Sequence, residues 1–358
     1  MCDLDRSTQV GNNKKIKVMV VDDSAFMRFT ISKHLNMTPN IQVIASARDG
    51  KEALELLEKF HPDVITLDIE MPRLDGLSTL REIMARFPCP VIMLSSLTKE
   101  GASETVRALT LGAVDFVAKP DNKANIAEVM NEVISKIFKV INAKVFAIPI
   151  QTNTANEKST ETKIVRSMNA KDKVLIIGSS TGGPRALNTI IPVIENISAA
   201  VLIVQHMPVG FTRSLAERLD SISRIKVKEA EPGDTLEVGK ALIAPGGFHM
   251  VLDSEKKIML NQNPTVHGVR PAIDITMFSV VQNFGKSVVS VILTGMGIDG
   301  TSGSTLIHCS GGYVFAEAES SCVVWGMPRS VVEAGVADMV LPITEIGPAV
   351  VEYLRRVG

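Results

Sequence analysis

The 358-residue sequence contains few cysteines, and their spacing already narrows the class of protein. Only Cys2, Cys89, Cys309 and Cys322 occur, and no two of them form a C-x-x-C pair. Scattered cysteines of this kind favour neither a zinc site nor a disulfide framework, and they are typical of a reducing compartment. We therefore expect a cytoplasmic protein.

The sequence also lacks long apolar runs and an excess of charge of one sign. Its long uncharged stretches are interrupted by Pro, Gly, His or Asn, so we expect no insertion into a membrane. Residues 1–6 contain no apolar core of a signal peptide. Lys and Arg number 38 against 39 Asp and Glu, giving a formal net charge of −1. This balance does not favour nucleic acid as a partner.

The sequence has two regions in which strand-like and helix-like segments alternate. A length of 358 residues agrees with two domains, each large enough to bury a core. In the first region, apolar runs are followed by helical patterns such as 51–60 and 75–86, which predicts a parallel sheet with helices on both faces. The apolar runs lie near residues 16–21, 41–45, 63–67, 90–95 and 113–117, and a helical stretch near 122–143 follows them.

The second region begins near residue 172, after a polar stretch. Residues 151–163 lack hydrophobic periodicity and predict a flexible linker. Beyond it, a hairpin-like segment lies near 249–260, and strands are expected near 173–177, 199–205, 241–244, 288–294 and 312–316. We therefore expect a five-stranded parallel α/β domain over 15–140, a linker over 141–171 and a doubly wound, mainly parallel α/β domain over 172–358.

Polar side chains follow the strands of the first predicted sheet. Asp22 and Asp23 end its first strand and Asp68 ends its third, and ligand sites form outside the carboxyl ends of parallel strands. Three converging carboxylates repel one another unless a cation such as Mg²⁺ neutralises them. Ser95 and Lys119 add a hydroxyl and an ammonium group to the same edge. Helix capping would explain Asp22 and Asp23 alone, and solvation would explain Lys119 alone, but neither explains the set.

The segments that contain these residues resemble a response-regulator receiver domain with a flavodoxin-like fold. The matching segments are residues 20–24, 67–76, 94–96 and 115–120. The resemblance implies that Asp68 accepts phosphate from a histidine kinase and that Asp22 and Asp23 bind Mg²⁺ together with it. It further implies that Ser95 hydrogen-bonds to the phosphoryl group and that Lys119 pairs with it.

A serine turn with glycines on both sides follows the first predicted strand of the second domain. Residues 178–182 fit the pattern G-x-S-x-G, which lifts a serine hydroxyl above the edge of an α/β sheet. Ser180 has a glycine two residues to either side and Ser179 does not, so Ser180 is the candidate nucleophile. A connecting turn, or one that binds phosphate at a helix N-terminus, would give the same short pattern.

Two further strand ends offer partners for this serine. His206 follows the apolar run 200–205, and Asp299 follows the predicted strand 288–294 and the glycine-rich turn after it. A structural histidine and a helix N-cap are the alternatives for these two residues taken singly. Together the three strand ends bring serine, histidine and aspartate to one edge. Their chain order differs from the Ser, Asp, His order of α/β-hydrolases, which disfavours that family.

From about residue 172 to the end, the sequence resembles the catalytic domain of the chemotaxis protein-glutamate methylesterases. Members of this family usually have alanine where this chain has Ser179 and glutamine near Glu317. We expect neither change to touch the candidate catalytic residues, and we expect Glu317 to alter the rim of the site or its charge. The matching segments are residues 178–183, 205–208, 244–250, 293–300 and 326–328.

This second resemblance implies hydrolysis of glutamate γ-methyl esters on the cytoplasmic helices of chemoreceptors, with release of methanol, and deamidation of receptor glutamines. Ser180 would attack the carbonyl, His206 would act as general base and acid, and Asp299 would orient the imidazole. Backbone N–H groups near residues 181–182 or 296 are candidates for the oxyanion hole. The esterase site would need no metal or other cofactor.

Two other functions deserve comparison with a phosphorylation-controlled esterase. A DNA-binding response regulator needs a basic helix-turn-helix, and the second region has glycine-rich strand ends instead. A non-catalytic phosphate-binding module leaves His206 and Asp299 unexplained.

We expect a monomer in which the unphosphorylated receiver covers Ser180. Phe116 stands where many receivers have the switch tyrosine, so no hydroxyl contact is expected there.

Overall fold

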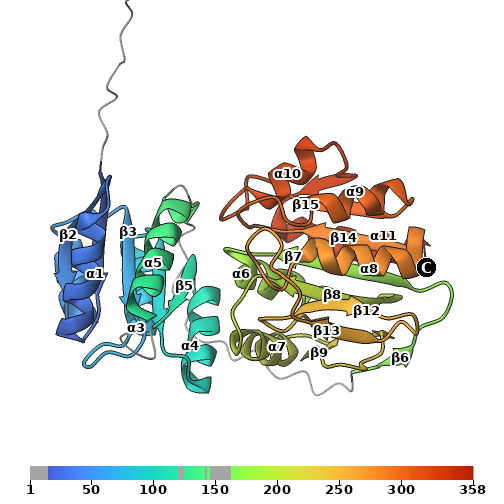
Figure 1. The fold of residues 1–358 in the computed structure, drawn as a ribbon, viewed down its shortest axis with the longest axis horizontal. Helices are drawn as coiled ribbons and strands as arrows, with labels where there is room; N and C mark the ends of the chain where they lie inside the picture. The colour runs from blue at the N-terminus through green and yellow to red at the C-terminus, as the bar shows by residue number, and fades with distance from the viewer. Residues whose placement is uncertain (1–14, 120–124, 142, 146–162, 358) are drawn as a thin grey trace, which may run out of the picture.

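The computed structural model describes residues 15–119, 125–141, 143–145 and 163–357. Figure 1 shows two α/β units side by side, the first running from blue to bluish green and the second from yellowish green to red. Each unit has a central parallel sheet with helices on both faces, as the alternation of segments predicts. Every described helix is too short or too polar to cross a membrane.

The first unit is a five-stranded parallel sheet in the order β2-β1-β3-β4-β5. All five residues of β3 and of β4 are buried, as expected for strands covered by helices on both faces. Its strands are β1 (Ile16–Val21), β2 (Ile41–Ala47), β3 (Val64–Asp68), β4 (Val91–Ser95) and β5 (Asp115–Ala118). Its helices are α1 (Ala25–Met37), α2 (Gly50–Leu57), α3 (Gly76–Arg86), α4 (Lys99–Thr110) and α5 (Ile126–Val140).

The second unit is a seven-stranded parallel sheet in the order β16-β15-β14-β7-β8-β11-β9. Its first strand, β7, is central, and the chain adds strands to one side of it before it returns to the other. The strands are β7 (Lys173–Ser179), β8 (Ala199–Gln205), β9 (Lys226–Glu229), β11 (Lys240–Ile243), β14 (Val288–Ile292), β15 (Tyr313–Glu317) and β16 (Met339–Leu341). A reversal of strand order of this kind leaves a crevice at the carboxyl ends of the central strands.

The helices of the second unit and a small hairpin complete the layers. The helices are α6 (Gly183–Ile190), α7 (Phe211–Ile222), α8 (Ile273–Phe284), α9 (Thr301–Cys309), α10 (Met327–Glu333) and α11 (Ile343–Val357). The expected hairpin is present as the antiparallel pair β12 (His249–Leu252) and β13 (Ile258–Asn261).

The ten strands expected from apolar runs all form, with ends within two residues of the predicted bounds. The edge strands β9 and β16 were not predicted, because β9 is largely charged and β16 has three residues. Residues 122–124 and 142 of the expected helix near 122–143 lie outside the described residues, as do residues 146–162 of the expected linker.

One part of the expected linker, 141–171, is ordered against the second unit, contrary to a flexible linker throughout. There β6 (Arg166–Ser167) pairs with β10 (Glu237–Val238), and the Arg166 guanidinium bonds to both carboxylate oxygens of the buried Asp172. This pairing depends on a strand some seventy residues further along the chain, which is why the polar composition alone did not indicate it.

The two units are in direct contact. Helix α4 of the first packs against α6 and α7 of the second, and buried apolar residues of both units form one continuous cluster. Across this contact the rings of Phe116 and Phe211 lie 4.4 Å apart between centroids. The contact therefore brings strand β5 of the first unit next to the crevice of the second.

Candidate active site

Ser180 lies immediately beyond the carboxyl end of the central strand β7. The turn that follows it needs glycine, because Gly182 has φ 79° and a Cβ there would lie 2.6 Å from Val323. Helix α6 begins at Gly183, where a Cβ would lie 2.0 Å from the Gln205 amide oxygen. The glycines thus permit the sharp strand-to-helix turn that leaves the Ser180 side chain partly exposed.

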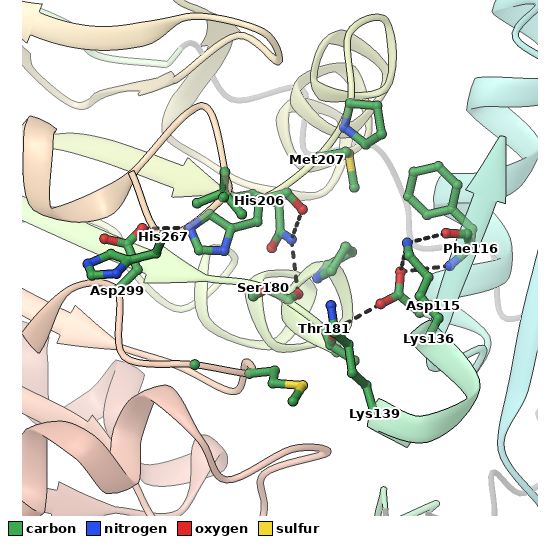
Figure 2. A pocket seen from close by; sticks show the side chains of 18 of the residues that line it. Asp115, Phe116, Lys136, Lys139, Ser180, Thr181, His206, Met207, His267 and Asp299 are labelled. Carbon is green, nitrogen blue, oxygen red and sulfur yellow. Dashed lines mark hydrogen bonds and ion pairs between the residues drawn. The ribbon is translucent and has the colours of Figure 1, made fainter. Parts of the chain in front are cut away.

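His206 and Asp299 meet Ser180 at this edge, as predicted. His206 follows β8, Asp299 lies in the turn before α9, and their Nε2 and Oδ2 atoms are 2.7 Å apart. Both residues line a cavity of about 530 Å³ together with Ser180. Within the described chain the Ser180 hydroxyl forms no hydrogen bond with the His206 ring, but the second ring nitrogen points toward Ser180 (Figure 2). Since Nε2 is engaged by Asp299, Nδ1 is the nitrogen available to accept a proton.

The buried Asp299 carboxylate is held by backbone amides as well as by His206. It accepts hydrogen bonds from the N–H groups of Ile273 and Asp274 at the start of α8, at 2.7 and 3.0 Å. Burial raises the pKa of Asp299, but the His206 hydrogen bond and these amides outweigh it and hold the pKa below its usual range. Asp299 therefore remains ionised beside the imidazole. Its carboxylate caps the start of α8 as well as lying before the start of α9.

Residues of the first unit form part of the wall of the same cavity. The Thr181 hydroxyl donates to Asp115 Oδ2 at 2.8 Å, and the ammonium group of Lys136 lies 2.8 Å from Asp115 Oδ1 (Figure 2). Burial lowers the pKa of Lys136, but Asp115 and Glu132 outweigh it and raise the pKa. A charged pair of the first unit thus lies next to the residue that follows Ser180.

Three polar residues at this site were not identified from the sequence. His267 also lines the cavity, and its Nε2 lies 3.4 Å from a carboxylate oxygen of the buried Asp274. The backbone N–H of Asp274 in turn donates to Asp299 Oδ1. Asp115 belongs to the first unit. No pattern in the sequence indicates these contacts, because they arise where separate loops and units meet.

Glu317 lies away from the rim of this cavity, contrary to expectation. Its side chain is 1 % exposed, and its carboxylate accepts hydrogen bonds from Thr294 N at 2.8 Å and from the Ser321 hydroxyl at 2.9 Å. Burial raises its pKa, and these hydrogen bonds offset that only in part. Because Thr294 O accepts from Ser180 N at 3.1 Å, Glu317 lies beneath the serine turn.

The acidic residues of the first unit converge as predicted. Carboxylate oxygens of Asp22, Asp23 and Asp68 lie within 4.8 Å of one another, and Asp22 and Asp68 are buried. The Lys119 ammonium lies 2.6 Å from Asp68 Oδ2 and 3.3 Å from Asp22 Oδ2. Burial raises the pKa of Asp68 to about 6 although Lys119 lowers it. The oxygens fit a hard divalent cation, which prefers carboxylates.

Ser95 is at the end of β4, as predicted, and its hydroxyl forms hydrogen bonds with α4. It donates to Gly101 O at 3.1 Å and accepts from the Thr105 hydroxyl at 2.6 Å, both in α4. A hydrogen bond from Ser95 to a group on Asp68 therefore requires its hydroxyl to give up the bond to Gly101 O. Pro120 of the matching segment lies outside the described residues.

Each of the two units matches a known protein family. The family model for the response regulator receiver domain matches residues 18–131, and that for the CheB methylesterase matches residues 175–350. The crystal structure of the Thermotoga maritima CheB methylesterase catalytic domain is 47% identical with a TM-score of 0.50, covering 51% of this chain and 98% of that one. Fold and site therefore define a response regulator whose output domain is an esterase.

Relatives that match along nearly the full length identify the family. A protein-glutamate methylesterase/protein-glutamine glutaminase of Symbiobacterium thermophilum is 49% identical, covering 96% of this chain and 98% of its own. One of Pyrococcus horikoshii is 45% identical over 96% and 94%. The chain belongs to the family of protein-glutamate methylesterases/protein-glutamine glutaminases.

Proposed function

We propose that this enzyme demethylates glutamate γ-methyl esters on cytoplasmic helices of chemoreceptors and deamidates receptor glutamines, with Ser180, His206 and Asp299 as its catalytic residues. The bond between His206 and the buried Asp299 at 2.7 Å, in the cavity that Ser180 lines, is the observation on which the proposal rests most. We further propose a receiver domain over 15–140 and a catalytic domain over 172–358.

In the proposed reaction the Ser180 oxygen attacks the ester carbonyl while His206 takes its proton at Nδ1. Asp299 holds the imidazole through Nε2 and stabilises the imidazolium that forms. As the tetrahedral intermediate collapses and the C–O bond breaks, His206 returns the proton to the leaving methoxy oxygen, giving methanol, or to the leaving nitrogen of a glutamine, giving ammonia. Water then hydrolyses the acyl-enzyme by the same proton transfers. The Thr181 N–H donates to no acceptor among the described residues, which supports it as an oxyanion donor.

Phosphorylation of Asp68 by a histidine kinase is the second part of the proposal. The buried position of Asp68 and its contact with Lys119 support it as the phosphate acceptor, with Lys119 pairing with the phosphoryl group. Asp22, Asp23 and Asp68 would hold Mg²⁺, which neutralises phosphoryl charge when bound. Ser95 would turn from α4 to contact the phosphoryl oxygens.

The contact between the units supports inhibition by the unphosphorylated receiver. Asp115 bonds to the residue after Ser180, and Phe116 packs on Phe211 at the foot of α7. A receptor helix could not approach Ser180 from that side while the two units touch. Phosphorylation would shift β5 and α4, loosen this contact and expose the serine.

Methanol release from methylated receptor membranes, with and without a small-molecule phosphodonor, tests the proposal. We expect Ser180→Ala to lose activity by about 10⁶-fold, the scale for removal of a triad serine. We expect Asp68→Asn to keep its basal activity but to gain nothing from the phosphodonor. Methanol release by Ser180→Ala at the wild-type rate would refute the catalytic assignment, and phosphodonor activation of Asp68→Asn would refute the acceptor.

A further inference from the structure

Gln205 is a buried amide between the two strands that end at Ser180 and His206. It is the last residue of β8, is 2 % exposed, and pairs in register with Ser179 of β7. Its Nε2 donates to Ser180 O at 2.9 Å and to His206 O at 3.0 Å. One side chain therefore links the peptide of the proposed nucleophile to the peptide of the proposed base.

The Ser179 hydroxyl fixes the orientation of this amide. It donates to Gln205 Oε1 at 2.6 Å and is itself fully buried. If the amide were turned over, Oε1 would face two carbonyl oxygens and both N–H groups would lose these acceptors, in a place that water does not reach. Gly183 leaves room for the arrangement, because a Cβ there would lie 2.0 Å from Oε1.

Fixing the Ser180 carbonyl also fixes the next N–H group. The Ser180 C=O and the Thr181 N–H belong to one planar trans peptide, so they point in opposite directions. With Gln205 Nε2 and the Gly183 N–H, at 2.7 Å, both bound to Ser180 O, the Thr181 N–H points away from the strands. An oxyanion donor must be held in a fixed orientation before the reaction, and these two bonds hold the peptide that contains the Thr181 N–H.

We propose that Gln205 is a positioning residue for the esterase reaction and that Ser179 acts through it. Gln205 holds the Thr181 N–H and the His206 backbone in the geometry of the transition state, while Ser179 keeps its amide in the active orientation. This inference rests on the proposed function, because it assigns the two residues a role only if Ser180 and His206 react.

The test is steady-state methanol release by the full chain with phosphodonor. We expect Gln205→Leu to lower kcat by about 10²-fold, the scale for a misplaced reacting group, with KM within about twofold of the wild type. We expect Ser179→Ala to lower kcat by about fivefold. Since Ser179 acts through Gln205, the double variant should be no slower than Gln205→Leu alone, which is coupling that a double-mutant cycle measures.

Matched controls separate positioning from general loss of structure. Ser290→Ala removes another fully buried strand serine, whose hydroxyl has no hydrogen-bond partner among the described residues. Gln282→Leu makes the same change as Gln205→Leu at an exposed position of α8. Both controls should keep the wild-type kcat. A loss in Ser290→Ala equal to that in Ser179→Ala, or additive losses in the double variant, would overturn the proposal.

A charged variant gives a pH dependence of activity that a purely structural role of Gln205 would not produce. Gln205→Glu replaces the donor NH₂ by an acceptor that repels the two carbonyls, and the new carboxyl group can donate only when protonated. Its activity relative to the wild type should therefore rise as the pH is lowered, while Gln205→Leu stays in constant ratio. Full activity of every Gln205 variant beside an inactive Ser180→Ala would refute this inference alone, whereas an active Ser180→Ala would refute the proposed function itself.

Discussion

The Thr181 hydroxyl donates a 2.8 Å hydrogen bond to the Asp115 carboxylate, so the residue after Ser180 is bound to the receiver domain. Asp115 is in turn held by Lys136, and Phe116 beside it packs on Phe211. Strand β5 of the receiver leads to Lys119, which contacts the acidic cluster. The same strand therefore also forms part of the wall of the cavity that Ser180 lines. A change at one end of β5 is well placed to affect the other.

Removal of the Asp115 carboxylate should activate the unphosphorylated enzyme. A hydrogen bond to a charged group contributes about 1.5–3 kcal/mol, so we expect Asp115→Ala to raise methanol release without phosphodonor by about tenfold. With phosphodonor, the variant and the wild type should have equal rates. Glu128→Ala, which removes an exposed acidic residue of α5, is the control. A basal rate that is unchanged in Asp115→Ala would contradict a blocking role for this contact.

His206, and not the other histidine that lines the cavity, should act as the base. His206→Gln should lower kcat by at least about 10⁴-fold, because proton transfer and the Asp299 pair are both lost. His267→Gln should lower kcat by less than tenfold, since His267 contacts Asp274 and its bond to that carboxylate is 3.4 Å long. Initial rates of methanol release measure both. The reverse order of effects would move the general base to His267.

Glu317 should make stability fall as the pH rises. Burial raises its pKa in the folded state, so between its ordinary and its raised pKa the folded chain binds more protons than the unfolded chain. Glu317→Gln removes this dependence while the amide oxygen can still accept from Thr294 N. Its unfolding temperature should therefore exceed that of the wild type at pH 8 by more than at pH 4.

Thermal unfolding at the two pH values measures this difference, with Glu345→Gln, an exposed change in the first turn of α11, as control. A difference between Glu317→Gln and the wild type that does not change with pH would show that Glu317 titrates normally in the folded protein.

Removal of Mg²⁺ should abolish activation without lowering basal activity. The carboxylates that would hold the ion belong to the receiver, and the cavity that Ser180 lines contains no member of that cluster. We expect a chelator to remove the phosphodonor-dependent increase in methanol release and to leave the basal rate within about twofold. A matching loss of the basal rate would place a metal in the esterase reaction.

Strand position and hydrophobic pattern were enough to predict the two sheets and most residues of the two candidate sites. Strands buried on both faces appear as continuous apolar runs, and residues that end parallel strands meet at one edge because of the sheet geometry. For that reason Asp22, Asp68 and Lys119 in one unit, and Ser180, His206 and Asp299 in the other, were predictable from position alone. The register of G-x-S-x-G also distinguished Ser180 from Ser179.

The groups that surround those residues follow from the tertiary fold and from no local sequence pattern. The hydrogen bonds from the Thr181 hydroxyl to Asp115, from Thr294 N to Glu317, and from Ser179 through Gln205 to Ser180 join segments with no common local pattern. A side-chain hydrogen bond is made or lost when the distance between two strands or units changes by a few tenths of an ångström. Hydrophobic periodicity does not encode distances this accurately. For the same reason Glu317 was expected at the rim and lies instead beneath the serine turn.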